Sequence, residues 1–340
     1  MSERPTPGRP RISVVIPSYN RLDSLCDALH GLAAQSLPAE CFEVLVIDNA
    51  STDGTLEHVR SMAPAMPYPL RVHRIPGENR GPAPARNFGV GLALGEVIAF
   101  TDSDCRPEPR WLQAGLAAFD DPALAFATGV VDFKPEQINR LGFFARHTVV
   151  SGFEHPTYPT ANAFYRKDVF VQFGGFDELL SFPSLLGVAM EAADTDLAWR
   201  IKEAGHRNAF VADAIVHHEV QVVSPRNWLL EPLRLFLVPA LVKLHPGLRG
   251  TLLAHGLFFY RGSIGYYIAL LAAIALAVLR PSLLLVLPVL LIAIAAVKAR
   301  SLRPNDVLTR AGQIVLNAMR IYVMSFALIG GSLRSRTLVL

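Results

Sequence analysis

The sequence predicts an α/β fold with a doubly wound, mostly parallel sheet flanked by helices, followed by C-terminal membrane helices. Short apolar runs that end in turn residues alternate with stretches of helical spacing, which is the rhythm of such a sheet. Hydrophobic residues make up 51% and charged residues 18% of the 340-residue chain, and the apolar excess lies almost wholly after Ser263. Because a soluble domain has about 25% charged residues, some of this surface must face something other than water.

The first two strands are expected at Ile12–Ile16 and Val44–Ile47, and each precedes a polar turn and a helix, at Leu22–Leu32 and Thr55–Arg60. A third apolar strand is expected at Val97–Phe100. Further strands are expected at Arg71–Ile75, Leu124–Phe133 and Phe210–Val216, and further helices at Pro84–Leu94, Trp111–Phe119 and Asp194–Ala204. Ligands bind at the carboxyl ends of parallel strands, so the polar residues after the first three strands should share one rim.

Two apolar runs near the C-terminal end, Ile264–Leu279 and Ser282–Val297, are separated only by Arg280 and Pro281. As helices each would be about 24 Å long against a hydrocarbon core of about 30 Å, and we expect a tight transmembrane hairpin. The alternative is a buried helix pair in a soluble protein. Basic residues follow at Lys298, Arg300, Arg303 and Arg310. By the positive-inside rule, the segment that carries these basic residues should lie in the cytoplasm. The N-terminal half of the chain should then lie in the cytoplasm as well.

Two segments beside the hairpin are less apolar. Trp228–Leu248 mixes Leu, Phe and Val with basic side chains, which suits a helix in the membrane interface. Ala311–Gly331 resembles a third span, but Gln313, Asn317 and Arg320 interrupt it. Because a lone Arg is costly in lipid, the alternative is a helix that lies against the hairpin or the interface.

Charge and cysteine content exclude several classes of protein. The net charge of +3 and the absence of a basic stripe interleaved with aromatics argue against a nucleic-acid partner. Cys26, Cys41 and Cys105 form no paired motif, so we expect free thiols in a reducing compartment. The oligomeric state is left open.

Six motifs, in order along the chain, resemble those of family-2 glycosyltransferases of the GT-A fold over roughly residues 11 to 220. They are Val14–Asn20, Asp48–Thr55, Asn79–Gly81 with Ala85–Asn87, Asp102–Asp104, Gly174–Glu178, and Asp194–Leu197 followed by Arg200. Each motif alone is a weak signal, whereas six in the family's order are a strong one.

The resemblance implies an inverting, metal-dependent transfer of a sugar from a nucleotide-diphosphate sugar. Asp102 and Asp104 offer two oxygen ligands one residue apart at a strand end, and a divalent cation there, Mn²⁺ or Mg²⁺, would neutralise the diphosphate. In the family, the position of Asp104 is the main metal ligand, that of Asp102 lies near the ribose or the metal, and that of His218 is a further ligand or diphosphate contact. An isolated Asp-x-Asp pair is more often a solvated turn, but its place after a buried strand favours the metal.

The resemblance also implies a set of donor-binding residues. They are Pro17, Tyr19, Asn20, Asp48, Asp53, Arg86, Asp102 and Ser103. Asp48 would hydrogen-bond the nucleobase, with a turn cap as the alternative, and for Asp53 a structural cap is an equal alternative. Arg86 would pair with the base or the phosphates, unless it is a surface side chain.

Asp194 is the candidate general base, because inverting transfer needs one carboxylate to take the proton from the acceptor hydroxyl. The family usually has Glu directly before this Asp, but here Ala193 precedes it and Glu191 lies two positions earlier. Asp196 is the nearest rival. The residues expected on the acceptor side are Asn162, Gly174, Gly175, Asp177 and Arg200. Arg200 could instead form an i,i+4 ion pair with Asp196.

The expected organisation has five segments. They are a disordered leader at 1–10, a nucleotide-sugar-binding half at 11–105, an acceptor-side half at 106–222, an interfacial helical segment at 223–262, and a transmembrane hairpin with a third membrane-associated helix at 263–340. The expected donor is a UDP-, GDP- or dTDP-sugar. The expected acceptor is a hydroxyl or phosphate of a membrane lipid or lipid-linked glycan of the cell envelope. The alternatives are a nucleotidyltransferase-like enzyme and a non-catalytic membrane scaffold.

Overall fold

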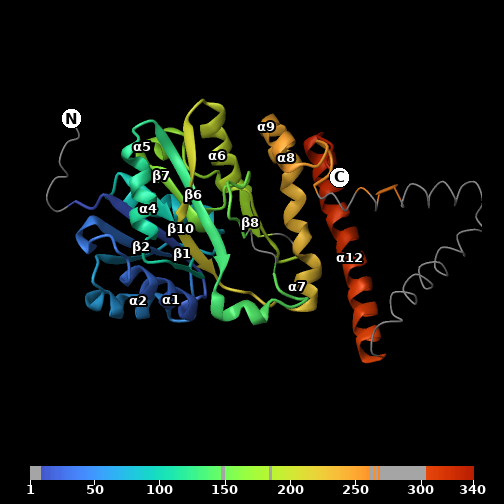
Figure 1. Cartoon of the computed structure of the whole chain (residues 1–340), viewed down its shortest axis with the longest axis horizontal. Coiled ribbons are helices and arrows are strands. Elements are labelled where there is room, and N and C mark those ends of the chain that lie inside the picture. Colours follow the sequence, from blue (N-terminus) through green and yellow to red (C-terminus); the bar gives the residue numbers. More distant parts are fainter. Residues whose placement is uncertain (1–8, 147–149, 184–185, 260–263, 265–266, 269–303) are drawn as a thin grey trace, which may run out of the picture. The chain divides into compact units, whose positions relative to one another are not determined.

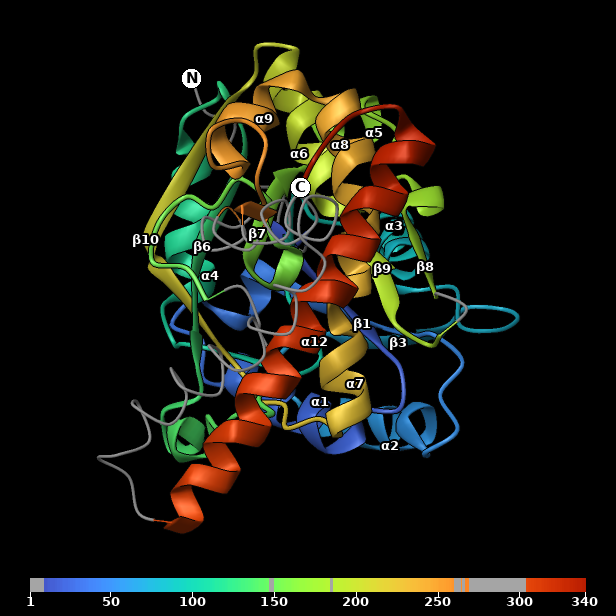
Figure 2. The ribbon, with the colours of Figure 1, turned by 90° about the vertical axis from the view of Figure 1, so that its right-hand side faces the viewer.

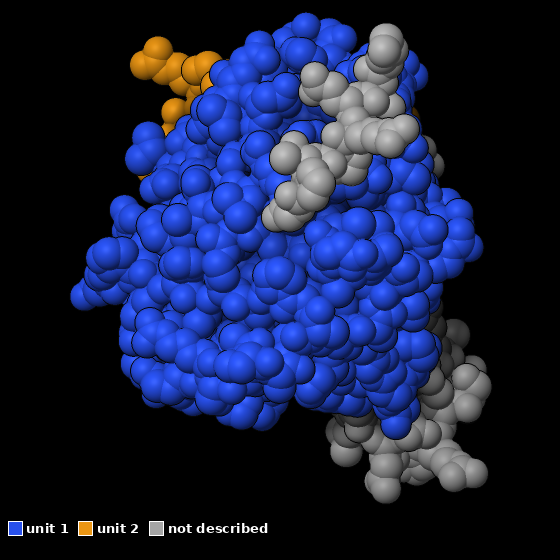
Figure 3. Space-filling view, turned by 90° about the vertical axis from the view of Figure 1, so that its left-hand side faces the viewer, with its two compact units in different colours: residues 1–224 blue, residues 225–340 orange. Residues whose placement is uncertain are grey.

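The computed structural model describes residues 9–146, 150–183, 186–259, 264, 267–268 and 304–340 (Figure 1). It divides into two compact units, Met1–Ser224 and Pro225–Leu340 (Figure 3). The expected disordered leader at 1–10 falls mostly outside the described residues, as does nearly all of the expected hairpin at Ile264–Val297.

The first unit is built on one eight-stranded mixed sheet with the order β3-β2-β1-β4-β7-β6-β10-β5. Its strands are β1 (Ile12–Ser18), β2 (Phe42–Asp48), β3 (Leu70–Arg74), β4 (Val97–Phe100), β5 (Cys105–Pro107), β6 (Leu124–Phe133), β7 (Ala163–Arg166) and β10 (Arg207–His218). The strands β3, β2, β1 and β4 are parallel to one another, and β6 is parallel to β10. The strands β7 and β5 run antiparallel to their neighbours, and a hairpin of β8 (Ser181–Pro183) and β9 (Ala189–Glu191) forms a second sheet.

Helices flank this sheet, as the sequence predicts. They are α1 (Leu22–Ala33), α2 (Thr55–Met62), α3 (Pro82–Leu92), α4 (Trp111–Ala117), α5 (Lys167–Gln172) and α6 (Ala193–Glu203). Alternate residues of β1 face opposite layers. Val14 and Ile16 join a core cluster with residues of α1 and α4, whereas Val15 faces Gly89 of α3. Burial on both faces explains why the central strands read as continuous apolar runs.

Pro17 lies inside β1 rather than after it, which extends the strand beyond its expected end. Pro17 pairs with Ile47 of β2, while the pairing of β1 with β4 ends at Val15. Since β4 ends before this point, Pro17 has no neighbouring strand on the β4 side to which an N–H would donate. The missing N–H is therefore tolerated.

Asn162 joins the second half of the sheet to helix α4. Its Oδ1 accepts a hydrogen bond from Trp111 Nε1 at 2.8 Å, and its Nδ2 donates to the carbonyls of Val130 and Ala214, each at 2.8 Å. Both Asn162 and Trp111 are fully buried. Trp111 therefore packs in the core, and Asn162 can shape the acceptor side only through the strands it holds.

The second unit contains the helices α7 (Pro225–Leu230), α8 (Val238–Leu244), α9 (Pro246–Leu252) and α12 (Pro304–Ser335), with a 3₁₀ segment at Glu231–Leu237 (Figure 2). One described helix, Gly312–Ser335 within α12, is long and apolar enough to cross a membrane. Arg320 in this helix is not a lone charge. It donates to Glu231 Oε2 at 2.6 Å and to the carbonyl of Trp228, and its guanidinium lies 4.5 Å from the Trp228 ring centroid.

Candidate active site

The carboxyl ends of β1, β2 and β4 lie together, because Ser18 pairs with Asp48 and Val15 with Phe100. Several buried side-chain atoms around this rim have no hydrogen-bond partner among the described residues. They are Ser18 Oγ, Asp48 Oδ2, Arg86 Nε, Thr101 Oγ1 and Glu191 Oε1. Buried polar atoms are normally satisfied, so this cluster indicates a place for a polar ligand. Ser18 and Thr101 were not among the site residues predicted from the sequence, because buried hydroxyls in and after strands are common.

Asp48 is fully buried at the end of β2. Its Oδ1 accepts a hydrogen bond from the backbone N–H of Ser51 at 3.1 Å. Its Oδ2 lies 3.4 Å from Arg74 Nε without a hydrogen bond. One oxygen thus holds the turn, while the other is left for a ligand, so the cap and the nucleobase contact are compatible roles.

Asp53 and Asn20 hold the neighbouring loops. The carboxylate of Asp53 accepts from the backbone N–H groups of Leu22 at 3.2 Å and Thr55 at 3.1 Å. Partial burial raises the pKa of Asp53, but these bonds and one from the Thr55 hydroxyl lower it overall. Asn20 adopts a positive φ of 50° and accepts from the N–H of Thr52 at 2.7 Å. This arrangement fits the capping alternative for Asp53. Tyr19 is exposed beside these loops, and Ser103 is buried.

Asp102, Asp104 and His218 come together with Cys105 at the ends of β4 and β10. Their ligand atoms all lie within 4.8 Å of one another. His218 Nδ1 lies 2.8 Å from the carbonyl of Glu219, which can only accept, so Nδ1 carries the proton and Nε2 faces Asp104 Oδ1 at 3.5 Å. Burial, together with the charges of Asp104 and Asp102, raises the pKa of the Cys105 thiol well above its usual value. The carboxylate oxygens of Asp102 and Asp104 and the unprotonated imidazole nitrogen of His218 therefore fit a divalent cation.

Two side chains that the sequence analysis did not single out contact Asp104. Arg21 Nη1 lies 3.1 Å from Asp104 Oδ2, and Gln221 Nε2 donates to the same oxygen. Arg21 directly follows the first motif, and Gln221 lies three residues after His218. Both flank the cation site with groups that can also contact a bound phosphate.

Arg86 is the buried, positively charged side chain of the site. It is 4% exposed, donates to Asp102 Oδ1 at 2.7 Å, and lies 5.9 Å from the Phe176 ring centroid. Burial lowers the pKa of Arg86, but the charges of Asp102, Glu191 and Asp194 raise it overall. Arg86 is therefore not the surface side chain of the alternative, and its charge acts on carboxyl groups from three separate segments, of which Asp102 is the one it hydrogen-bonds.

Asp194 and Glu191 are the two carboxyl groups beyond Asp102 in this cluster. Asp194 begins α6, where its Oδ1 accepts from the N–H of Thr195 at 2.7 Å. Burial raises the pKa of Asp194, against the lowering effect of the Thr195 hydrogen bond and of Arg86. Burial likewise raises the pKa of Glu191 to about 7, although Arg86 opposes the shift. Carboxyl groups with raised pKa in a polar cluster are typical of proton-transfer sites.

Apart from Asn162, the residues expected on the acceptor side hold α6 and the turn at 174–177 together. Arg200 pairs with Asp196 at 2.8 Å, as the i,i+4 alternative predicted, and also donates to the carbonyls of Phe173 and Gly175. Gly174 and Gly175 both have positive φ, and a Cβ at Gly175 would lie 2.7 Å from Asn87 Oδ1. Asp177 accepts from the N–H of Leu179 at 2.9 Å and caps the next turn. These residues fix the turn that carries Phe176 under Arg86.

Comparison with known proteins gives a family for the first unit. Residues 13–174 match the family model of Glycosyl transferase family 2. Glycosyltransferase AglE of Haloferax volcanii is 29% identical over 214 residues, 62% of this chain and 67% of that protein. Validoxylamine A glucosyltransferase of Streptomyces hygroscopicus is 42% identical over 118 residues, 34% of this chain and 27% of that protein. The chain thus spans about two thirds of the first relative and about a quarter of the second.

Solved structures share the fold. The mannosyltransferase PcManGT from Pyrobaculum calidifontis, in complex with GDP-Man and Mn²⁺, has a TM-score of 0.56 and 24% identity, covering 96% of this chain and 87% of its own. TarS from S. aureus, residues 1–349 in complex with UDP-GlcNAc, has a TM-score of 0.51 and 21% identity, covering 70% and 73%. The expected α/β sheet with flanking helices is confirmed.

The raised pKa of Glu191 makes stability depend on pH. Below pH 4.5 Glu191 is protonated in both the folded and the unfolded chain. Between pH 4.5 and about 7 the folded chain keeps this proton, whereas the unfolded chain loses it. The unfolded state then binds fewer protons, so the contribution of Glu191 to stability is lost as pH rises to about 7. We expect Glu191→Gln, which mimics the protonated acid, to match the wild type at pH 4.5 and to exceed it in stability by about 3 kcal/mol at pH 8.

Urea denaturation of both proteins across this pH range measures the difference. The exposed residue Glu96 provides a matched control, since Glu96→Gln should leave the pH profile of stability unchanged. A stability difference between Glu191→Gln and the wild type that does not vary with pH would contradict the assignment.

Proposed function

Since residues 13–174 form a glycosyltransferase family 2 domain, we propose that this enzyme transfers a sugar, with inversion, from a nucleotide-diphosphate sugar to an acceptor hydroxyl or phosphate. The carrying observation is the arrangement of Asp102, Asp104 and His218 as a cation site with Asp194 coupled to it through Arg86. This arrangement provides a place for the diphosphate and, separately, a carboxylate that can accept a proton.

The cation, Mn²⁺ or Mg²⁺, would be held by Asp104, His218 and Asp102. When bound it would stabilise the negative charge of the departing diphosphate. Arg21 now pairs with Asp104, and it lies where it can donate to a phosphate oxygen once that carboxylate binds a cation. Asp48 Oδ2, which is ion-paired with Arg74 but makes no hydrogen bond among the described residues, supports a hydrogen bond to the nucleobase, with Tyr19 and Asn20 beside it. The solved relatives hold GDP-Man and UDP-GlcNAc, so UDP, GDP and dTDP all stay candidates for the nucleotide.

Asp194 is the proposed base. It would accept the proton of the acceptor hydroxyl as the oxygen attacks the anomeric carbon from the face opposite the nucleotide. Its pKa is raised by burial, which makes the carboxylate a better proton acceptor than an exposed Asp. Asp196, the rival, is bound to Arg200 through Oδ2, and this pairing favours a structural role.

A membrane-borne acceptor is supported by the second unit. Exposed large apolar side chains follow each other at spacings of three or four along α12, which places them on one face of the helix. They are Val315, Met319, Tyr322, Phe326, Ile329 and Leu333. Such a face is suited to lipid, and we propose a cytoplasmic catalytic unit that acts on a lipid or lipid-linked glycan of the cell envelope.

We expect Asp104→Asn to abolish cation-dependent nucleotide binding, because it removes the main metal ligand. Isothermal titration of UDP, GDP and dTDP with Mn²⁺, before and after chelation, measures this. In the wild type, chelation should weaken the preferred nucleotide by about ten-fold or more. The variant should show no response to Mn²⁺, while the exposed control Asp132→Asn should behave as wild type. A full Mn²⁺ response in Asp104→Asn would contradict the proposed site.

We expect Asp194→Asn to bind the donor normally and to lose transfer by about 10²- to 10⁴-fold, because the amide cannot accept the proton. Donor affinity and single-turnover rates measure the two effects separately. The exposed control Asp213→Asn should retain both. Normal transfer in Asp194→Asn would move the base to Asp196 or Glu191.

Membrane attachment predicts that the full chain resists a high-salt wash of the membrane fraction and is released by detergent. Phe326→Asp combined with Leu333→Asp should lower the membrane-bound fraction, because these side chains are 74% and 77% exposed on the proposed lipid face. Leu179→Asp, at an equally exposed leucine of the first unit, is the control. Complete release of the wild type by salt alone would exclude attachment through this face.

A further inference from the structure

The chain segment that follows β10 runs directly past the cation cluster. The N–H of Glu219 donates to the carbonyl of Asp104 at 2.9 Å, and Ser24 Oγ of α1 donates to Glu219 Oε2 at 2.6 Å. Two residues further on, the carbonyl of Gln221 accepts from the N–H of Arg146 at 2.8 Å. The backbone of Gln221 is thus held in place beside Asp104.

The side-chain amide of Gln221 has its orientation fixed by its two partners. Its Nε2 donates to Asp104 Oδ2, and its Oε1 accepts from Arg146 Nη1 at 3.2 Å. A guanidinium group can only donate and an ionised carboxylate can only accept, so an amide turned the other way would lose both hydrogen bonds. Arg146 therefore holds the amide in the orientation that donates to Asp104.

The two carboxylate oxygens of Asp104 differ in what they contact. Oδ2 accepts from Gln221 Nε2 and from Arg21 Nη1, the latter at 3.1 Å, whereas Oδ1 lies 3.5 Å from His218 Nε2. Each carboxylate oxygen has about two lone-pair sites, so the two donors account for those of Oδ2. Oδ1, next to the unprotonated nitrogen of His218, is the oxygen left for a cation.

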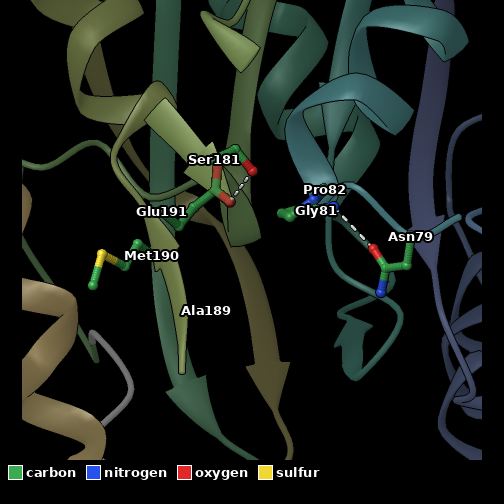
Figure 4. Close-up of a pocket in the computed structure, with 7 residues that line it drawn as sticks. All are labelled: Asn79, Gly81, Pro82, Ser181, Ala189, Met190 and Glu191. Carbon is green, nitrogen blue, oxygen red and sulfur yellow. Dashed lines mark hydrogen bonds between the residues drawn. The ribbon is translucent and has the colours of Figure 1, made fainter. Parts of the chain in front are cut away.

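The choice between these two oxygens matters because the described residues offer the cation few ligands. The side chains whose ligand atoms lie within 4.8 Å of one another are Asp102, Asp104, Cys105 and His218. Glu191 lies outside this group, in the β8–β9 hairpin, where its Oε2 accepts from Ser181 Oγ at 2.7 Å (Figure 4). The coordination of the cation therefore depends on the oxygens that the two aspartates present.

We propose that Gln221, held by Arg146, is a positioning residue that makes Asp104 available to the cation through Oδ1 alone. The inference rests on the proposed function. Arg21 is free to turn from Oδ2 to a phosphate oxygen, whereas Gln221 is tied to Arg146 through both its backbone and its amide. Gln221 is therefore the donor that keeps Oδ2 occupied when the nucleotide binds.

Coordination through one oxygen has a consequence for the choice of cation. Mg²⁺ requires near-ideal octahedral geometry, whereas Ca²⁺ accepts more ligands in flexible geometry and often takes both oxygens of one carboxylate. An Asp104 that offers Oδ1 alone favours the smaller cations over Ca²⁺. Loss of the Gln221 amide should therefore reduce this selectivity.

The test compares nucleotide binding in two cations. The full chain is titrated calorimetrically with the diphosphate that the wild type prefers among UDP, GDP and dTDP, in its preferred smaller cation (Mn²⁺ or Mg²⁺) and separately in Ca²⁺. We expect Gln221→Met to weaken binding in the smaller cation by about ten-fold and to change binding in Ca²⁺ by less than about two-fold. Gln172→Met, at an exposed glutamine of α5, should match the wild type in both cations.

Arg146→Met tests the link from the other end. It should shift selectivity in the same direction, because the amide of Gln221 is then no longer held. Adding Arg146→Met to Gln221→Met should cause no further loss in the smaller cation, since Arg146 acts on Asp104 through that amide. Additive losses would contradict this link.

Equal losses in the two cations would mean that Gln221 merely stabilises the fold around the site, and unchanged binding would exclude any role for it. Either result overturns the inference, as does a wild type that binds the nucleotide equally well in Ca²⁺. Should Gln221→Met not fold, Arg146→Met alone must show the selective loss. A wild type whose nucleotide binding needs no cation would instead refute the cation site of the proposed function.

Discussion

The site depends on one buried, positively charged side chain. Arg86 is almost fully enclosed, hydrogen-bonds Asp102, and is coupled to Glu191 and Asp194. Those three carboxyl groups follow β4, end β9 and begin α6, so one guanidinium ties together segments that are far apart in sequence. Without it, mutual repulsion would oppose the convergence of the carboxylates, and removal of one partner from a buried ion pair is strongly destabilising. Burial nevertheless raises the pKa of Glu191 and of Asp194, against the opposing effect of Arg86.

Local pattern was enough to predict the rim. The strands Val97–Phe100 and Leu124–Phe133 have the expected bounds, because strands buried on both faces leave continuous apolar runs that end where polar residues begin. The antiparallel β7 and the β8–β9 hairpin were not predicted. The partners of β7 lie far away along the chain, and the strands of the hairpin are only three residues long, so neither carries much periodic signal. The contacts of Arg21 and Gln221 with Asp104 were missed for the same reason.

Motif residues were harder to separate by role than to find. Asp and Asn bind ligands, but their short polar side chains also hold turns and helix starts. Side-chain oxygens of Asp53, Asp177 and Asn162 accept hydrogen bonds from backbone or core groups. Asp48 and Glu191 each keep one buried oxygen without a hydrogen bond among the described residues. The distinction between support and contact therefore lies in which hydrogen bonds are already made, and that depends on tertiary structure.

In the second unit, too, an arginine is stabilised by a carboxylate from another segment. Arg320 stood out in the sequence as an expensive charge in an apolar helix, yet it pairs with Glu231 and stacks on Trp228. An ion pair with these contacts presents much less charge to its surroundings than a lone guanidinium, so the apolar character of α12 is preserved around it. The pair also fixes α12 against the segment that begins the unit. An arginine that would argue against a membrane helix in isolation thus becomes the contact that orients the exposed apolar face of that helix.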